Sequence, residues 1–237
     1  MELSASIHRL KRKARLLARE QAIPLHEALD RIALQEGYRS WSLLAARHAA
    51  IAPATRFSRR LREGDLVLLG ARPRQGKTLM ALELAVEAMK SGRRSIFFTL
   101  EYTEKDILAR FRAIGVEPAH FGDLFAFDCS DAISADYMMA TLETAPAGTL
   151  VVVDYLQLLD QRRDTPPLAL QVGRLKLFAR QRGLVMVFIS QIDRLYDLST
   201  KPHPGIQDVR LPNPLDLTLF DKACFLHEGE IRFHMPG

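Results

Sequence analysis

Residues 66–78 read LVLLGARPRQGKT, a short apolar run that leads into a loop ending in Gly76-Lys77-Thr78. The apolar run is typical of a buried strand, and residues Leu79 to Ser91 have the pattern of a helix. The first N–H groups of a helix have no partner within that helix, and they attract anions. The sequence therefore predicts a phosphate-binding loop between this strand and this helix.

The loop contains the residue types that bind nucleotide phosphates and Mg²⁺. Gly76 lets the backbone approach a phosphate, Lys77 can reach the β and γ oxygens, and the Thr78 hydroxyl can bind Mg²⁺. The pattern G-x-x-x-x-G-K-[ST] differs at its first position, where this chain has Ala71. A Gly-Lys-Thr that opens an ordinary surface helix is the alternative. The predicted nucleotide-binding residues are Arg74, Gln75, Gly76, Lys77 and Thr78.

The composition is that of a soluble globular protein with one sizeable core and a small appendage. The chain has 237 residues, of which 48% are hydrophobic and 26% are charged. No apolar run approaches the roughly 18 residues that a membrane span needs, and the N-terminus lacks the apolar stretch of a secretory signal. We therefore expect a cytoplasmic protein without a membrane partner. Cys129 and Cys224 stand alone, which favours core thiols over a disulfide or a metal site.

Positive charge is concentrated at the front of the chain. Residues 1–62 contain thirteen Lys and Arg against five Asp and Glu, whereas the remainder contains twenty against twenty-three. Such a basic region suits a polyanion such as nucleic acid. A solvated helix face explains the same charges equally well.

Residues 3–48 have the apolar spacing of three short amphipathic helices. Leu3 begins the pattern, Pro24 opens the second helix and Ser40 caps the third. We predict a basic helical region at 1–50, a linker at 51–61 and a larger domain at 62–237. The cations between Arg9 and Arg19 are the predicted contact with nucleic acid or protein.

From Asp65 onward, short apolar runs alternate with helical stretches, which predicts an α/β domain. Strands this apolar are buried on both faces, as in a mainly parallel sheet flanked by helices. The closing segments Ala223–His227 and Glu230–His234 predict a hairpin. The predicted strands are Leu66–Leu69, Ser95–Leu100, Leu124–Phe127, Leu150–Val153 and Leu184–Ile189, and the predicted helices are Leu79–Ser91, Glu104–Ile114, Ala135–Thr144 and Leu168–Arg182.

Polar residues end several of these strands, where functional groups gather in parallel sheets. Asp154 fits the carboxylate that supports Mg²⁺ beside Thr78, although an Asp that caps a helix is the alternative. Glu101 can deprotonate or orient an attacking water, or it can be a solvent-facing residue at a helix start. Gln191 offers an amide that can report whether a γ-phosphate is present.

Together these motifs resemble the RecA-like motor domain of DnaB-type replicative helicases, over residues 62–226. The resemblance implies a RecA-like P-loop fold, a three-layer αβα sandwich, with ATP and Mg²⁺ as ligands. It implies Lys77 at the phosphates, Glu101 as catalytic base, Gln191 as sensor, and Thr78 with Asp154 at the metal. The matching motifs are Ala71-Arg72-Pro73, Gly76-Lys77-Thr78, Thr99-Leu100-Glu101, Val153-Asp154-Tyr155-Leu156-Gln157-Leu158 and Ser190-Gln191-Ile192-Asp193-Arg194.

The resemblance also locates a DNA-facing loop at Leu195 to Ile206, followed by Asp208-Val209-Arg210. The family has a Lys-x-Arg-x-Gly pattern after its last apolar run, and its arginine reaches the neighbouring subunit's ATP. This sequence lacks that pattern, and such a finger contributes about three to five orders of magnitude in rate. Slow hydrolysis is therefore expected, unless Arg232 or another residue substitutes.

The predicted function is Mg-dependent ATP hydrolysis by a DnaB-like ATPase that acts on or near DNA in replication or maintenance. The expected partners are ATP and ADP, single-stranded or forked DNA, and further copies of the chain, with a hexameric ring as one form. One alternative is a regulatory or adaptor ATPase that assembles on ATP without unwinding DNA. Another is a DNA-binding module with a degenerate ATP site.

Overall fold

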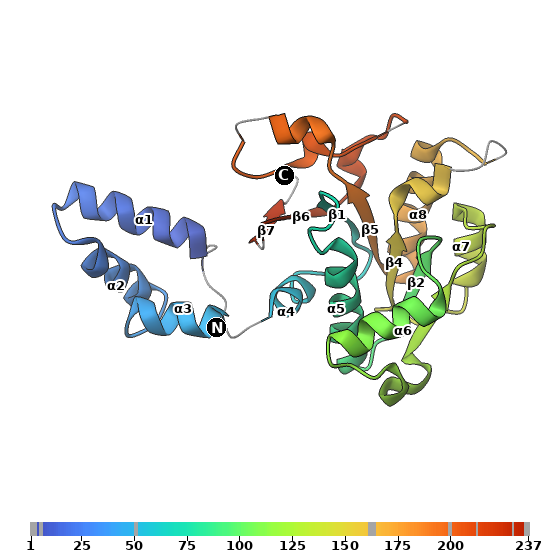
Figure 1. The fold of residues 1–237 in the computed structure, drawn as a ribbon, viewed down its shortest axis with the longest axis horizontal. Coiled ribbons are helices and arrows are strands. Elements are labelled where there is room, and N and C mark those ends of the chain that lie inside the picture. The colour runs from blue at the N-terminus through green and yellow to red at the C-terminus, as the bar shows by residue number, and fades with distance from the viewer. Residues whose placement is uncertain are drawn as a thin grey trace. The chain divides into compact units, whose positions relative to one another are not determined.

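A computed structural model describes residues 4, 7–49, 52–160, 165–198, 201–211, 213–228 and 230–234. The chain divides into two compact units, Met1–Ala52 and Pro53–Gly237, and each is described by itself (Figure 1). Within the described ranges, no helix is both long and apolar enough to cross a membrane.

The first unit consists of three helices, α1 (Ile7–Glu20), α2 (Leu25–Gln35) and α3 (Trp41–Ala49). Pro24 precedes α2 as predicted, and Gly37 follows it with a φ of 81°. The three helices share a small core of Leu10, Ala14, Ala28, Ile32, Ala33 and Leu44. Leu3 and Ile51, which the predictions also used, lie outside the described residues.

The linker predicted at 51–61 is wrong over residues 53–58. These residues form helix α4 (Pro53–Ser58), and Ala54 and Phe57 are buried in the core of the second unit. A six-residue helix is too short to show a helical period in the sequence, and Pro53 is compatible with the first position of a helix.

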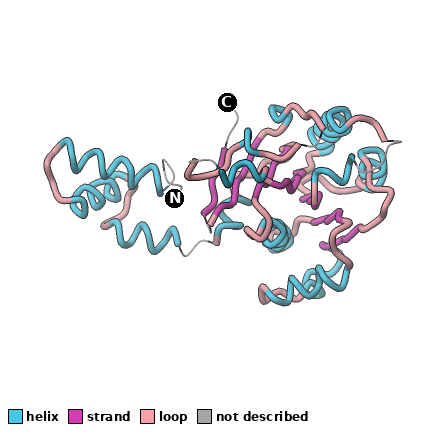
Figure 2. Tube along the Cα trace, turned by 45° about the horizontal axis from the view of Figure 1, so that its top comes forward, coloured by secondary structure: helices cyan, strands magenta, loops and turns pink. Residues whose placement is uncertain are grey.

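The second unit is built on a seven-stranded sheet with the order β3-β2-β4-β5-β1-β6-β7. Every neighbouring pair is parallel except β6 with β7, which form the predicted hairpin. Figure 2 draws these strands in magenta and the helices in cyan. The strands are β1 (Leu66–Ala71), β2 (Ser95–Thr99), β3 (Phe125–Asp128), β4 (Leu150–Asp154), β5 (Val185–Gln191), β6 (Lys222–His227) and β7 (Glu230–His234).

Helices cover both faces of this sheet, so the predicted three-layer αβα architecture is confirmed. In β1, Leu66 and Leu68 face one core and Val67 and Leu69 face the other, as the alternation of side chains along a strand requires. Helices α7 (Ala135–Thr141) and α8 (Leu168–Arg182) pack on the first face, and α4, α5 (Lys77–Lys90) and α6 (Glu104–Ala113) pack on the second. The short 3₁₀ helices are Pro118–Leu124, Leu156–Asp160, Arg194–Leu198, Ile206–Asp208 and Leu217–Leu219.

Two local details follow from the packing of the second unit. A Cβ atom at Gly70 would lie 2.8 Å from the ring of Phe225, so glycine is needed where β1 passes β6. Cys224 is buried as predicted, and burial raises the pKa of its thiol. Cys129 is exposed, so its predicted place in the core is wrong.

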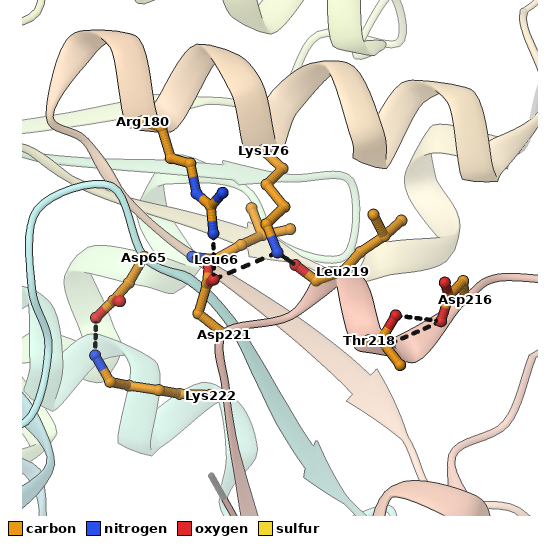
Figure 3. Close-up of polar contacts among 9 residues, drawn as sticks. All are labelled: Asp65, Leu66, Lys176, Arg180, Asp216, Thr218, Leu219, Asp221 and Lys222. Carbon is orange, nitrogen blue, oxygen red and sulfur yellow. Dashed lines mark hydrogen bonds and ion pairs between the residues drawn. The ribbon is translucent and has the colours of Figure 1, made fainter. Parts of the chain in front are cut away.

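The start of β1 is held by a group of charged side chains (Figure 3). The Asp221 carboxylate accepts hydrogen bonds from the Leu66 N–H at 2.9 Å and from Arg180 at 2.8 Å, and it lies 3.3 Å from Lys176 Nζ. Partial burial opposes ionisation of Asp221, but the Leu66 hydrogen bond and the two cations outweigh it and lower its pKa. This carboxylate therefore ties α8 to the start of β1.

We predict that Asp221→Asn lowers the free energy of unfolding by about 2 kcal/mol at pH 7, because the two cations lose their partner. Urea unfolding measures this difference. Because the pKa of Asp221 is lowered, its carboxylate stabilises the fold at pH values above its ordinary pKa of 3.8. The difference in stability between the wild-type protein and the variant should therefore narrow as the pH falls below about 4.

Asp216 provides the control for this prediction. Its exposed carboxylate accepts hydrogen bonds only from Thr218 among the described residues, and Asp216→Asn should change stability by less than about 0.5 kcal/mol. Equal losses in the two variants would contradict a special role for Asp221.

Candidate functional site

The candidate site lies where neighbouring parallel strands end. Ala71 of β1 pairs with Gln191 of β5, and Asp154 of β4 pairs with both Ile189 of β5 and Thr99 of β2. This register brings the polar residues that follow each strand to one edge of the sheet. Ligands bind at this edge in open α/β sheets.

The loop between β1 and α5 has the backbone geometry of an anion site. Gly76 precedes α5 with a φ of 83°, and Arg74 also has a positive φ of 65°. A Cβ at Gly76 would meet nothing within 4 Å, so the conformation and not the space favours glycine there. No side chain caps the start of α5, which leaves its first N–H groups available to a phosphate.

A buried contact links the loop to the end of β4. The Thr78 hydroxyl donates a hydrogen bond of 3.0 Å to Asp154 Oδ2, and both side chains are buried. Asp154 Oδ1 is also buried, and it has no hydrogen-bond partner among the described atoms. A buried oxygen without a donor is suited to a cation or to its bound water.

The environment of Asp154 raises its pKa to about 6. Burial is the main cause, and the negative charge of Glu101 adds to it, while Lys77 and the Thr78 hydrogen bond act in the opposite direction. The three predicted residues Lys77, Thr78 and Glu101 therefore all lie close enough to Asp154 to influence its ionisation. A bound cation at this place would favour the ionised form.

The oxygen atoms of Thr78 and Asp154 suit Mg²⁺, which needs few protein ligands, better than a metal ion that is bound by protein side chains alone. Among the described residues no cluster of three or more His, Cys, Asp or Glu could hold a metal ion. Mg²⁺ commonly uses one or two protein oxygens together with water and substrate phosphates. Thr78 and Asp154 offer such a set beside the phosphate loop.

Glu101 follows β2 and is exposed to solvent. Its backbone N–H donates to the buried Thr99 hydroxyl at 3.0 Å, which holds the start of this loop. A shallow surface hollow lies beside Glu101, lined also by Tyr102 and Arg110, whose guanidinium lies 4.2 Å from the tyrosine ring. Arg110 also lowers the pKa of Asp154, a proximity that no sequence motif indicated.

Gln191 is the last residue of β5, next to Ala71 at the start of the loop. Its carbonyl oxygen accepts a hydrogen bond of 2.8 Å from the Arg210 N–H, and the neighbouring Ile192 N–H donates to the Ala71 carbonyl. The backbone therefore places Gln191 at the site, and its role as a sensor stays a prediction.

Two loop side chains make contacts that the sequence analysis missed. Arg72 binds Asp197 in the segment after β5, with contacts of 3.0 and 2.5 Å, and donates to the Ile192 carbonyl. Gln75 accepts a hydrogen bond of 2.9 Å from the N–H of Glu228 in the β6–β7 turn. The Gln75 side chain thus supports the loop, and its predicted phosphate contact would come from the backbone.

The predicted DNA-facing loop contains little free positive charge in the described residues. Lys201 forms an ion pair of 2.7 Å with Asp208, and residues 199–200 lie outside the described ranges. Gln157, in the motif after β4, donates to the Arg210 carbonyl at 2.9 Å. The segment after this loop is therefore tied to the ends of β4 and β5.

Comparison with known proteins supports the resemblance seen in the motifs. The model of the family described as DnaB-like helicase C terminal domain matches residues 55–117. A replicative DNA helicase DnaB of Helicobacter pylori is 23% identical over 71% of this chain, and one of Synechocystis is 26% identical over 63%. The matches cover 41% and 21% of those two proteins, so the chain spans less than half of their length.

Solved structures show the same fold. A structure described as an ATPase domain aligns with a TM-score of 0.59 at 20% identity, over 79% of this chain and 81% of its own. A DnaB-like replicative helicase, solved in a study of its interactions with primase, aligns with a TM-score of 0.61 at 20% identity, over 93% of this chain and 66% of its own. The predicted fold and resemblance are confirmed.

We predict that Asp154→Asn stabilises the ligand-free protein by about 2 kcal/mol at pH 8, because the buried charge is removed. A carboxyl with a raised pKa binds its proton more tightly in the folded state. The stability of the wild-type protein should therefore fall as the pH rises from about 4 to about 6, and the variant should lose this slope.

Asp128, at the end of β3, is the matched control. It accepts hydrogen bonds of 2.9 Å from the Ser130 N–H and the Tyr137 hydroxyl, so Asp128→Asn should not stabilise the protein. Urea unfolding between pH 4 and pH 8 compares the three proteins. A loss of stability in Asp154→Asn at pH 8 would contradict the prediction.

Proposed function

Because the chain carries a RecA-like domain of the DnaB type, we propose that it binds and hydrolyses ATP with Mg²⁺ and acts on or near DNA. The observation that carries this proposal is the buried contact between Thr78 of the phosphate loop and Asp154 at the end of β4. This contact joins the anion site of the phosphate loop to the Asp154 carboxylate. The other oxygen of that carboxylate has no hydrogen-bond partner among the described residues.

In this proposal the start of α5 binds the phosphates. The uncapped N–H groups and the half-buried Lys77 supply positive charge, and Thr78 with Asp154 would hold Mg²⁺. Mg²⁺, when bound, neutralises charge on the phosphate oxygens. The contacts of Arg72 and Gln75 with neighbouring segments keep the loop in place.

Glu101 serves as the catalytic base. Its exposure gives water access to the carboxylate, and the Thr99 hydrogen bond positions its backbone beside Asp154. A positioned carboxylate can orient a water and take its proton during attack on the terminal phosphate. Gln191, at the end of β5 beside Ala71, reports the presence of that phosphate.

The partners of this activity are proposed from the relatives. Two of them are named as replicative DNA helicases, so DNA, single-stranded or forked, is the proposed partner in replication or maintenance. We also propose a cytoplasmic homo-oligomer, with a hexameric ring as one form. Slow turnover is expected where no neighbouring arginine reaches the γ-phosphate.

A regulatory ATPase that assembles on ATP without unwinding is the second candidate. The observation in its favour is the ion pair between Lys201 and Asp208, which neutralises the one lysine of the predicted DNA-facing loop. An unwinding assay with a forked duplex separates the candidates. Strand separation that depends on ATP supports the helicase, and nucleotide-dependent assembly without it supports the regulator.

We predict that Lys77→Ala weakens the binding of a fluorescent ATP analogue at least tenfold and abolishes ATP turnover, because the phosphates lose a charged contact. Glu101→Gln should keep the binding and lower turnover at least a hundredfold, because it removes the base. Titration with Mg²⁺ present and phosphate release measure the two effects.

Exposed residues of α5 and α6 provide the controls. Lys90→Ala, at the other end of α5, and Glu104→Gln, at the start of α6, should leave binding and turnover unchanged. Normal turnover in Lys77→Ala would exclude the proposed site, and loss of binding in Glu101→Gln would assign that residue to the ligand contact instead of the chemistry.

A further inference from the structure

Four cations lie together on the exposed side of α1. Lys11, Arg12, Arg15 and Arg19 are all exposed, and we name this group the α1 basic stripe. At 3.6 residues per turn they occupy about 100° of the helix circumference. Lys11, Arg15 and Arg19 follow one another every fourth residue, so the stripe runs along about 12 Å of the helix axis.

The opposite side of α1 is used for the fold of its own unit. Leu10 and Ala14 are buried in the core shared by α1, α2 and α3, and Leu17 is packed against it. The apolar face is therefore occupied. Leu16 is the one large apolar side chain of α1 that is exposed among the described residues, so the helix offers an outside partner mainly charge. A membrane-surface helix needs a free apolar face, so a lipid bilayer does not fit.

The stripe also differs from the basic residues of α8, which form ion pairs with carboxylates. On α8, Arg174 pairs with Asp136, and Lys176 and Arg180 pair with Asp221. Among the described residues, no stripe side chain forms an ion pair or a hydrogen bond with another residue. Glu20, the one acidic residue of Ile7–Glu20, falls outside the stripe.

We propose that the α1 basic stripe binds the phosphate backbone of double-stranded DNA without reading its sequence. Closely spaced cations on one face match the closely spaced phosphates of a duplex, and binding them releases counterions. Single-strand binding sites add aromatic side chains on which bases stack, and α1 contains no Phe, Tyr or Trp. This inference deepens the proposed function by placing a DNA contact outside the ATPase unit, and it rests on the proposed action near DNA.

The test uses the full chain with the three substitutions Lys11→Gln, Arg15→Gln and Arg19→Gln. Fluorescence anisotropy with a labelled random duplex, without nucleotide, gives the association constant over a series of salt concentrations. The slope of log K against log salt should become shallower by about 2.7, which is about 0.9 for each lost phosphate contact. At about 50 mM salt the affinity should fall about tenfold or more.

A matched variant removes three exposed cations that have carboxylate partners. Arg31, Lys90 and Arg112 pair with Glu27, Glu87 and Glu117, so replacing these three cations with Gln should leave the slope unchanged. The single substitution Arg15→Gln, which should reduce the slope by about 0.9, covers the case of a triple variant that does not fold. The conservative variant Arg15→Lys should keep the slope.

Three results would overturn the inference. They are an unchanged slope in the stripe variant, an equal loss in the matched variant, and tighter binding to a single strand than to the duplex. ATP turnover is measured in parallel, because a wild-type protein that shows the salt effect but no turnover would refute the proposed ATPase and leave the stripe standing. Unchanged turnover in the stripe variant with reduced DNA affinity supports the inference.

Discussion

Four neighbouring parallel strands, β2, β4, β5 and β1, end at one edge of the sheet, and the candidate site depends on this register. It places Thr99 beside Asp154, and Gln191 beside Ala71, although these residues are far apart in the chain. Each strand is apolar on both faces, so helices must cover both sides and the strand ends remain the open place for polar groups. The phosphate loop extends from the same edge.

Two buried or partly buried aspartates show how differently a carboxylate can act in this fold. Asp221 is surrounded by two cations and a backbone donor, which lower its pKa and make its charge stabilising. Asp154 is buried with one hydroxyl donor, and its pKa is raised. The first carboxylate holds the structure together, whereas the second lowers stability in the absence of a ligand and supplies a charge that a ligand can use.

The two units also differ in whether their basic side chains form ion pairs. Arg174, Lys176 and Arg180 of α8 pair with carboxylates of the same unit, and Lys201 is paired with Asp208. The α1 basic stripe has no such described partners, and its helix has already buried its apolar face in the small core. The net charge of each unit does not show this difference, because the pairing of a cation depends on which side chains the folded chain brings together.

By itself, the sequence determined the alternation of strands and helices, the phosphate loop and the strand-end residues, because apolar periodicity and the Gly76-Lys77-Thr78 motif are local patterns. It did not show that residues 53–58 are helical and that Phe57 is buried, since a short helix has too few turns for a period. Only the tertiary structure decided the contacts of Arg72 with Asp197 and of Gln75 with Glu228, and the unpartnered oxygen of Asp154. The two contacts join segments more than 100 residues apart, and no local pattern encodes such a pairing.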